Sequence, residues 1–202
     1  MLILLFHCAA AHLAPCIYGI IKPTIKTDRK KCDFMIILGI DPGIAIVGYG
    51  VIEHIGNRYK TIAYDSILTP AHTPDQDRLK SIYTQLRQII YDYKPEVCAI
   101  EKLYYNNNAK TVIQVAQGRG VAILAAANER LKVYEYTPLQ IKQSLTGYGR
   151  ADKKQMQQMT KMILGLDKVP KPDDTADALA VAICHSHYAA YNMLNERLEE
   201  LK

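Results

Sequence analysis

The sequence lacks the cysteine patterns that would indicate a disulfide framework or a zinc site. It has five cysteines, an odd number, with no CxxC pair and no His/Cys spacing typical of zinc ligands. Eleven glycines and nine prolines are scattered without a period, which excludes a collagen-like repeat and a low-complexity disordered chain. No internal repeat and no linker is visible. These absences predict one globular domain in a reducing, cytoplasmic compartment.

Length and charge add to this picture. The 202 residues are 49% hydrophobic and 22% charged, which is enough for one packed core and too little for two comfortable domains. Positive charge is concentrated in residues 102–171, which hold twelve Lys or Arg and four Asp or Glu. This asymmetry favours a polyanionic partner. The alternative is that these lysines lie on ordinary solvated helix faces.

The first 34 residues differ from the rest of the chain. Residues 1–21 are apolar and uncharged, but the run lacks the positively charged start of a signal peptide and contains Pro15. A signal peptide and a membrane anchor are alternatives for this run. We favour an N-terminal extension, or a misassigned start, at residues 1–34, because Met35 opens a strong strand and the fold needs nothing before it. We therefore expect a functional domain at 35–202 and no membrane association.

The periodicity after Met35 predicts an α/β fold. Apolar or alternating runs predict strands at 35–40, 45–53, 59–68, 96–101 and 132–136. Three-and-four spacing and capping residues predict helices at 74–93, 109–130, 138–145, 152–164 and from Asp173, as the N-cap, towards Glu200. Because strands lie both before and between helices, we expect a mixed sheet covered by helices.

Four carboxylates stand at positions that the fold could bring together. Asp41 and Glu101 each end a buried strand, so their side chains would emerge side by side if those strands are parallel neighbours. Asp174 and Asp177 are three residues apart at the start of a helix, so they face the same way. Each also has a plain structural explanation, because Asp-Pro-Gly is a common turn and Asp is a common helix cap.

A convergent set of carboxylates needs cations, because the unpaired charges repel one another. Hard oxygen ligands select Mg²⁺ or Mn²⁺. Two such ions about 4 Å apart would activate a water and stabilise the leaving oxygen of a phosphodiester. The pattern therefore predicts metal-dependent phosphodiester hydrolysis without a covalent intermediate.

The order of these motifs is similar to that of a known family. The motifs are Gly39-Ile-Asp41-Pro-Gly43, Ala99-Ile-Glu101, Gln117-Gly-Arg119-Gly120 and Asp174-Thr-Ala-Asp177-Ala-Leu-Ala180. Together they resemble the RuvC family of Holliday junction resolvases over about residues 35–202. The resemblance implies a ribonuclease H-like fold with a mixed five-stranded sheet, a homodimer, and Mg²⁺-dependent paired nicks in four-way junction DNA, with two ions at each site and Mn²⁺ able to substitute. It also implies the branch-migration proteins RuvA and RuvB as partners.

The resemblance assigns roles to individual residues. It implies that the catalytic, metal-binding positions are Asp41, Glu101, Asp174 and Asp177. The aromatic residue that stacks on a junction base in the family matches Tyr104, and the basic positions that contact DNA match Lys142 and Lys153. Tyr stands here where the best-known member has Phe, and its ring can still stack.

Other motifs have structural interpretations. The Gln117–Gly120 segment lacks the Lys-Ser/Thr of a phosphate loop, so we expect close helix packing there, against a strand or a dimer partner. His185 and His187 are two apart and cannot both share the face of Asp177, so both are expected to be structural.

Two other functions are alternatives for this sequence. An actin-like or sugar-kinase-like ATPase also ends its nucleotide-binding strand in an Asp and Gly turn, but it needs a duplicated domain for which the chain has no room. A catalytically silent junction-binding protein is the second rival. The presence of all four acids argues against it.

Overall fold

The computed structural model describes residues 34–103 and 109–200. The expected extension, apart from Phe34, and the stacking residue Tyr104 lie outside the described residues. In chain order the elements are β1 (Phe34–Asp41), β2 (Ile46–Ile55), β3 (Arg58–Leu68), α1 (Asp75–Tyr93), β4 (Val97–Glu101), α2 (Ala109–Asn128), β5 (Lys132–Tyr136), α3 (Pro138–Thr146), α4 (Lys153–Ile163) and α5 (Asp173–Glu200).

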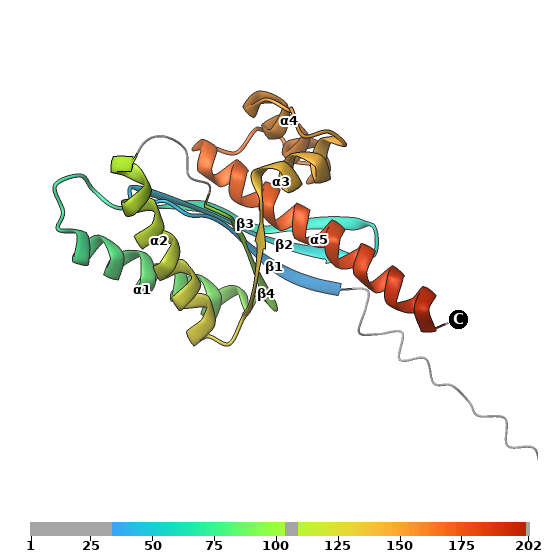
Figure 1. Ribbon diagram of the computed structural model, residues 1–202, viewed down its shortest axis with the longest axis horizontal. Helices are drawn as coiled ribbons and strands as arrows, with labels where there is room; N and C mark the ends of the chain where they lie inside the picture. The colour runs from blue at the N-terminus through green and yellow to red at the C-terminus, as the bar shows by residue number, and fades with distance from the viewer. Residues whose placement is uncertain (1–33, 104–108, 201–202) are drawn as a thin grey trace, which may run out of the picture.

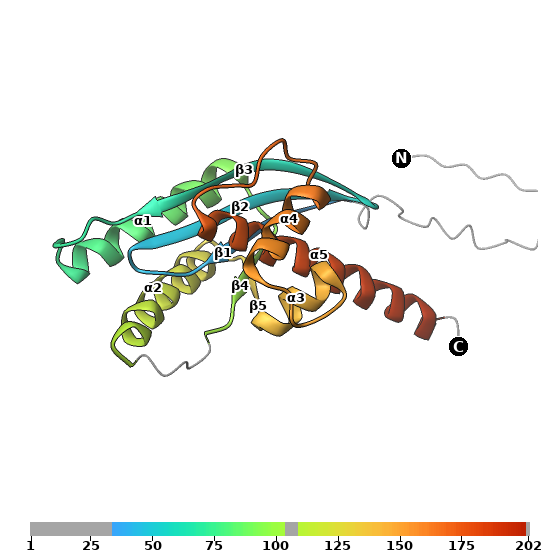
Figure 2. The ribbon, with the colours of Figure 1, turned by 90° about the horizontal axis from the view of Figure 1, so that it is seen from above.

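The strands form one sheet in the order β3-β2-β1-β4-β5. Pairing is antiparallel between β1 and β2 and between β2 and β3, and parallel between β1 and β4 and between β4 and β5. Helices α1 and α2 cover one face, and α3, α4 and α5 cover the other (Figures 1 and 2). The predicted mixed five-stranded sheet flanked by helices is confirmed.

Each face of the sheet has its own apolar core. Alternate residues of β1 serve opposite faces, as the period of two in a strand requires. Ile37 packs in the core beneath α3, α4 and α5, whereas Leu38 and Ile40 pack in the core beneath α1 and α2. Because both faces of β1 and β4 are covered, these strands are continuous apolar runs rather than alternating ones.

The backbone of helix α5 lies very close to strands β1 and β2, because Gly39 and Gly48 have no side chain there. A Cβ atom on Gly39 would stand 2.1 Å from the carbonyl oxygen of Ala178, and one on Gly48 would stand 2.0 Å from that of Asp174. These distances are far shorter than any van der Waals contact, so no other residue fits at either strand position. Glycine in β1 and β2 therefore fixes where α5 crosses the sheet.

Local signals in the sequence explain most of the helix boundaries. Asp152 and Thr137 each form a complete capping box, with Gln155 and Gln140 respectively. Helix α1 ends at Tyr93, and its C-cap Lys94 has a left-handed backbone and precedes Pro95.

The prediction for Asp173 was wrong in one detail. Asp173 is the first residue of α5 rather than its N-cap, and its carboxylate pairs with lysines instead.

Within residues 34–103 and 109–200, no helix is both long enough and apolar enough to cross a bilayer.

The glycine at position 39 provides a test of the close approach of α5. We expect Gly39→Ala to lower the free energy of unfolding by about 3 kcal/mol, because the added methyl group meets the backbone of α5 and cannot be accommodated by a rotamer change. Urea unfolding followed by circular dichroism measures this. An unchanged midpoint would show that α5 can move off β1 at no cost.

Candidate active site

Two of the predicted acidic residues emerge from neighbouring parallel strands. Asp41 is the last residue of β1 and Glu101 the last of β4. The register pairs Gly39 with Ala99, and the period of two then places Asp41 and Glu101 on the same face, towards α5. The condition set from the sequence, that the two strands be parallel neighbours, is met.

The other two acidic residues come from the start of α5. Gly48, which lies opposite Asp41 in the antiparallel pairing, is the position where the backbone at Asp174 touches the sheet. The first turns of α5 therefore cross β2 directly beside Asp41. Asp177, one turn further along, lines a cavity of about 220 Å³ together with Glu101.

The electrostatics of Asp41 show how tightly the acidic residues are gathered. Its pKa is well above its usual range, first because the carboxyl is buried and then because the charges of Glu101, Asp177 and Asp174 repel its ionised form. Lys153 opposes the rise. The charges of the three other predicted acidic residues thus all act on the carboxyl of Asp41.

Glu101 and Asp177 show the same two effects. Burial, followed by the charge of Asp177, raises the pKa of Glu101 to about 7, and Lys142 works against this shift. Burial also raises the pKa of Asp177, and Lys153 counters it. Full ionisation of these three carboxyls would therefore give the site more negative charge than Lys142 and Lys153 offset, which favours the binding of cations.

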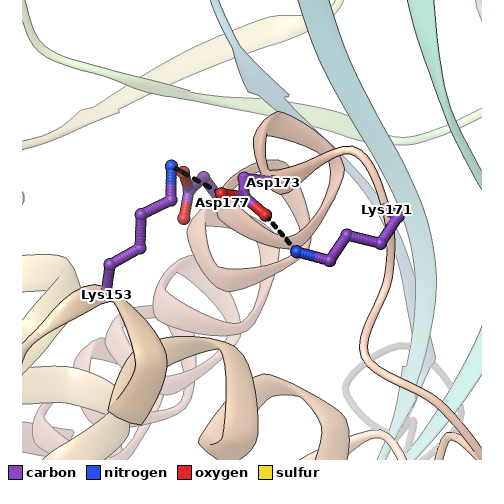
Figure 3. Close-up of polar contacts among 4 residues, drawn as sticks. All are labelled: Lys153, Lys171, Asp173 and Asp177. Atoms are coloured by element: carbon purple, nitrogen blue, oxygen red, sulfur yellow. Dashed lines mark hydrogen bonds and ion pairs between the residues drawn. The ribbon is translucent and has the colours of Figure 1, made fainter.

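The predicted DNA-contacting lysines lie in the same cavity as the acidic residues. Lys142 of α3 and Lys153 of α4 line it beside Glu101 and Asp177. Lys153 Nζ is 3.4 Å from Asp173 Oδ2 and 3.6 Å from Asp177 Oδ2 (Figure 3). Sequence reasoning did not anticipate that Lys153 would contact the acidic residues themselves.

A second cavity is also lined by Glu101. Its volume is about 230 Å³, and its lining includes Asp41, Lys102 and Val115 of α2. Glu101 thus borders both cavities, and Asp41 borders the second one.

The Gln117–Gly120 segment of α2 packs against the turn that follows Asp41. A Cβ atom on Gly118 would stand 2.2 Å from the carbonyl oxygen of Gly43, so α2 is pressed against the turn that follows Asp41. Arg119 Nε donates a hydrogen bond of 3.2 Å to the carbonyl oxygen of Glu101, and its Nη2 pairs with Glu135 of β5. Arg119 therefore anchors the end of β4, a role that the motif alone did not reveal.

The two histidines of α5 are structural, as expected. His185 is buried, and its Nδ1 lies 2.7 Å from the hydroxyl of Tyr136. Burial lowers the pKa of His185 to about 4, so the ring is neutral. His187 Nδ1 lies 2.8 Å from Ser144 Oγ. Neither histidine lines the cavity of the acidic residues.

The donor set suits a hard divalent cation. The carboxylates of Asp41, Glu101 and Asp177 offer hard oxygen donors in a partly buried site, and Mg²⁺ or Mn²⁺ would relieve the repulsion between them. Within residues 34–103 and 109–200, no three potential ligands already stand at coordinating separations. Coordination of a metal here would therefore involve side-chain movement, including at Asp177, whose carboxylate now contacts Lys153.

Comparison with known proteins identifies the family. The family model for crossover junction endodeoxyribonuclease RuvC matches residues 37–185. The chain belongs to the RuvC family. The RuvC of Alkaliphilus oremlandii is 59% identical over 153 residues, which cover 76% of this chain and 93% of that protein. The RuvC of Caldanaerobacter subterraneus is 57% identical over 164 residues, covering 81% and 98%.

A solved RuvC structure agrees with the fold. Thermus thermophilus RuvC in complex with Holliday junction substrate superimposes with a TM-score of 0.75 at 32% identity, covering 78% of this chain and 96% of that one. The ribonuclease H-like fold and the RuvC resemblance predicted from the sequence are both confirmed. Membership of a family of crossover junction endodeoxyribonucleases makes this chain a nuclease and implies a metal-dependent enzyme.

The raised pKa of Glu101 predicts that ionisation of this residue lowers the free energy of unfolding of the metal-free protein. An unfolded Glu ionises near pH 4.5, while the folded one keeps its proton to about pH 7, so stability falls as the pH rises through this window. We expect Glu101→Gln to remove the cost and to stabilise the metal-free protein at pH 8 by on the order of 2 kcal/mol.

The measurement is urea unfolding in a chelator at pH 5 and pH 8. The advantage of the Gln variant should shrink at pH 5, where parent and variant are both largely neutral at this position. A variant less stable than the parent at pH 8 would contradict the electrostatic account.

Proposed function

We propose that this protein is a Mg²⁺-dependent endonuclease that resolves four-way DNA junctions by paired, symmetric nicks during recombination and repair. The observation that carries the proposal is the meeting of Asp41, Glu101 and the start of α5 beside two lysines, in a chain of the RuvC family. The junction substrate is supported by the related Thermus protein, whose structure holds a Holliday junction.

In this proposal, Asp41, Glu101, Asp174 and Asp177 hold the metal, with two ions at each site. When bound, the metal supplies an activated water and stabilises the leaving oxygen of the phosphodiester. The protein contributes fixed positions for the carboxylates, two at strand ends and two on a helix held by backbone contact. Arg119 keeps the end of β4, and with it Glu101, in place.

The DNA-contacting residues in the proposal are Lys142, Lys153 and Tyr104. Both lysines border the acidic residues, so a phosphate bound by them would lie against the metal-binding carboxylates. Backbone contacts of this kind fix the position of the duplex without reading its sequence. Tyr104 is proposed to stack on an unpaired base of the junction.

We also propose the cellular setting that the family implies. The nuclease domain would be residues 35–202, with residues 1–34 as an extension. RuvA and RuvB would be its partners, and the protein would act in the cytoplasm.

Asp41 gives the direct test of the proposed activity. We expect Asp41→Asn to bind a synthetic four-way junction but to cut it about a hundredfold more slowly or worse, because the variant loses one of the carboxylates proposed to hold the metal. Denaturing gels of end-labelled junction arms measure the cuts, with linear duplex as the comparison substrate and with Mg²⁺ or a chelator. Asp65→Asn, exposed on the edge strand β3, is the matched control and should cut as the parent does.

The outcomes separate the alternatives. Paired cuts confined to the junction and abolished by the chelator or by Asp41→Asn support the proposal. Tight junction binding without cuts, even with Mn²⁺, would favour the silent binding protein. Equal cutting by Asp41→Asn and the parent would refute the proposed metal site.

We further propose that the active unit is a homodimer that pairs through α2. Ile113 and Leu124 on this helix are 66% and 52% exposed, and Ala116, Gly120 and Ala127 continue the same face. An exposed apolar helix face with small residues suits close packing against a second copy. A two-fold dimer would place its two sites on opposing strands of the junction, which accounts for symmetric cutting.

A charge on this face should separate the subunits. We expect Leu124→Glu to behave as a monomer in light scattering where the parent behaves as a dimer, and to lose paired cutting. Met162→Glu is the matched control, since Met162 is 70% exposed on α4, away from this face. A Leu124→Glu protein that remains dimeric would place the interface elsewhere.

A further inference from the structure

Lys153 is bound to acidic residues in the free protein. Its ammonium group lies between two carboxylates of α5, 3.4 Å from Asp173 Oδ2 and 3.6 Å from Asp177 Oδ2 (Figure 3). Asp173 is also held from its other side by Lys171, whose Nζ is 2.6 Å from Oδ1. The result is a chain of alternating charges that ends on a proposed metal ligand.

The carboxylates of Asp173 and Asp177 are placed so that both can contact the ammonium group of Lys153. Asp173 and Asp177 are four residues apart on α5, so they are stacked on one face of the helix. Lys153 is the first residue of α4, and the capping box at Asp152 fixes its backbone. Its long side chain can therefore turn between the two carboxylates while its Cα stays in place.

A metal ion and the ammonium group of Lys153 cannot both bind the carboxylate of Asp177. A cation bound to this carboxylate would lie close to the ammonium group, and like charges at such separations repel strongly in a partly buried site. Asp173 and the phosphates of a substrate are the other anions within reach of Lys153. A metal ion can therefore bind Asp177 only when Asp173 or a substrate phosphate binds the ammonium group of Lys153 instead.

We propose that Lys153 is an internal counter-ion that competes with the metal for Asp177, and that Asp173 is the positioning residue that takes Lys153 when the metal binds. This inference rests on the proposed metal site and extends it to regulation by the substrate. A DNA phosphate that engages Lys153 releases Asp177, so DNA binding raises metal affinity. By thermodynamic reciprocity, metal binding raises affinity for DNA to the same degree.

The competition is tested by calorimetric titration of the full chain with Mn²⁺ in the absence of DNA. Lys153→Ala should bind Mn²⁺ about fivefold more tightly than the parent, the scale of losing one partly exposed ion pair. Lys142→Ala removes a charge from the same cavity without breaking an ion pair to Asp177, and Lys154→Ala removes the neighbouring charge on α4. Both controls should tighten binding less than Lys153→Ala.

The role of Asp173 is tested by a double-mutant cycle. With Lys153 present, Asp173→Asn should weaken Mn²⁺ binding about threefold, because Lys153 then has only Asp177 as a partner. In the Lys153→Ala background, Asp173→Asn should have a smaller effect on Mn²⁺ affinity. With Lys153 present, the conservative change Asp173→Glu should keep the Mn²⁺ affinity of the parent. An equal factor in both backgrounds would overturn the role of Asp173 and leave only a general charge effect.

A failure of this inference is distinguishable from a failure of the proposed function. Mn²⁺ binding that Asp41→Asn abolishes, but that Lys153→Ala tightens no more than Lys142→Ala, would overturn the competition and leave the metal site intact. Absence of any Mn²⁺ binding sensitive to Asp41 would overturn both. DNA that leaves Mn²⁺ affinity unchanged, measured with an uncleavable phosphorothioate junction, would overturn the proposed coupling.

Discussion

The close contact between α5 and the backbone of β1 and β2 is the constraint on which the site depends. Gly39 and Gly48 leave no space for a side chain, so the helix rests against the strands themselves. An added layer of side chains would move Asp174 and Asp177 several ångströms from Asp41. The glycines therefore determine how close these carboxyl groups lie to one another, although they carry no functional group themselves.

Charge balance is the second constraint, and it works against stability. Burial and mutual repulsion raise the pKa of Asp41, Glu101 and Asp177 together, which is the pattern expected of a site assembled for a ligand rather than for folding. Lys142 and Lys153 offset part of this cost. The same lysines border the cavity that a phosphate would enter, so the groups that support the free site are also those that a substrate would engage.

The sequence was sufficient for the elements and for the strand-end carboxylates, because both follow from local patterns. A run of apolar residues ending in Asp-Pro-Gly predicts a buried strand and its turn. The order of strands and helices then predicted a mixed sheet, and the resemblance to the RuvC family implied the ribonuclease H-like fold. The Lys153 contacts could not be predicted in this way. They depend on how α4 is placed against α5, and a surface lysine reads the same in sequence whether it faces solvent or a carboxylate. Arg119 was missed for the same reason, since its partner is a backbone carbonyl of β4.

The place of β1 in the sheet has a consequence for hydrogen exchange. β1 is the central strand, bonded to β2 on one side and to β4 on the other, whereas β3 and β5 form the edges. Local opening begins at edges and reaches central strands only with global unfolding. The amide protons of the strand that ends in Asp41 should therefore be among the slowest to exchange. Fraying at either margin of the sheet would leave the aspartate in place.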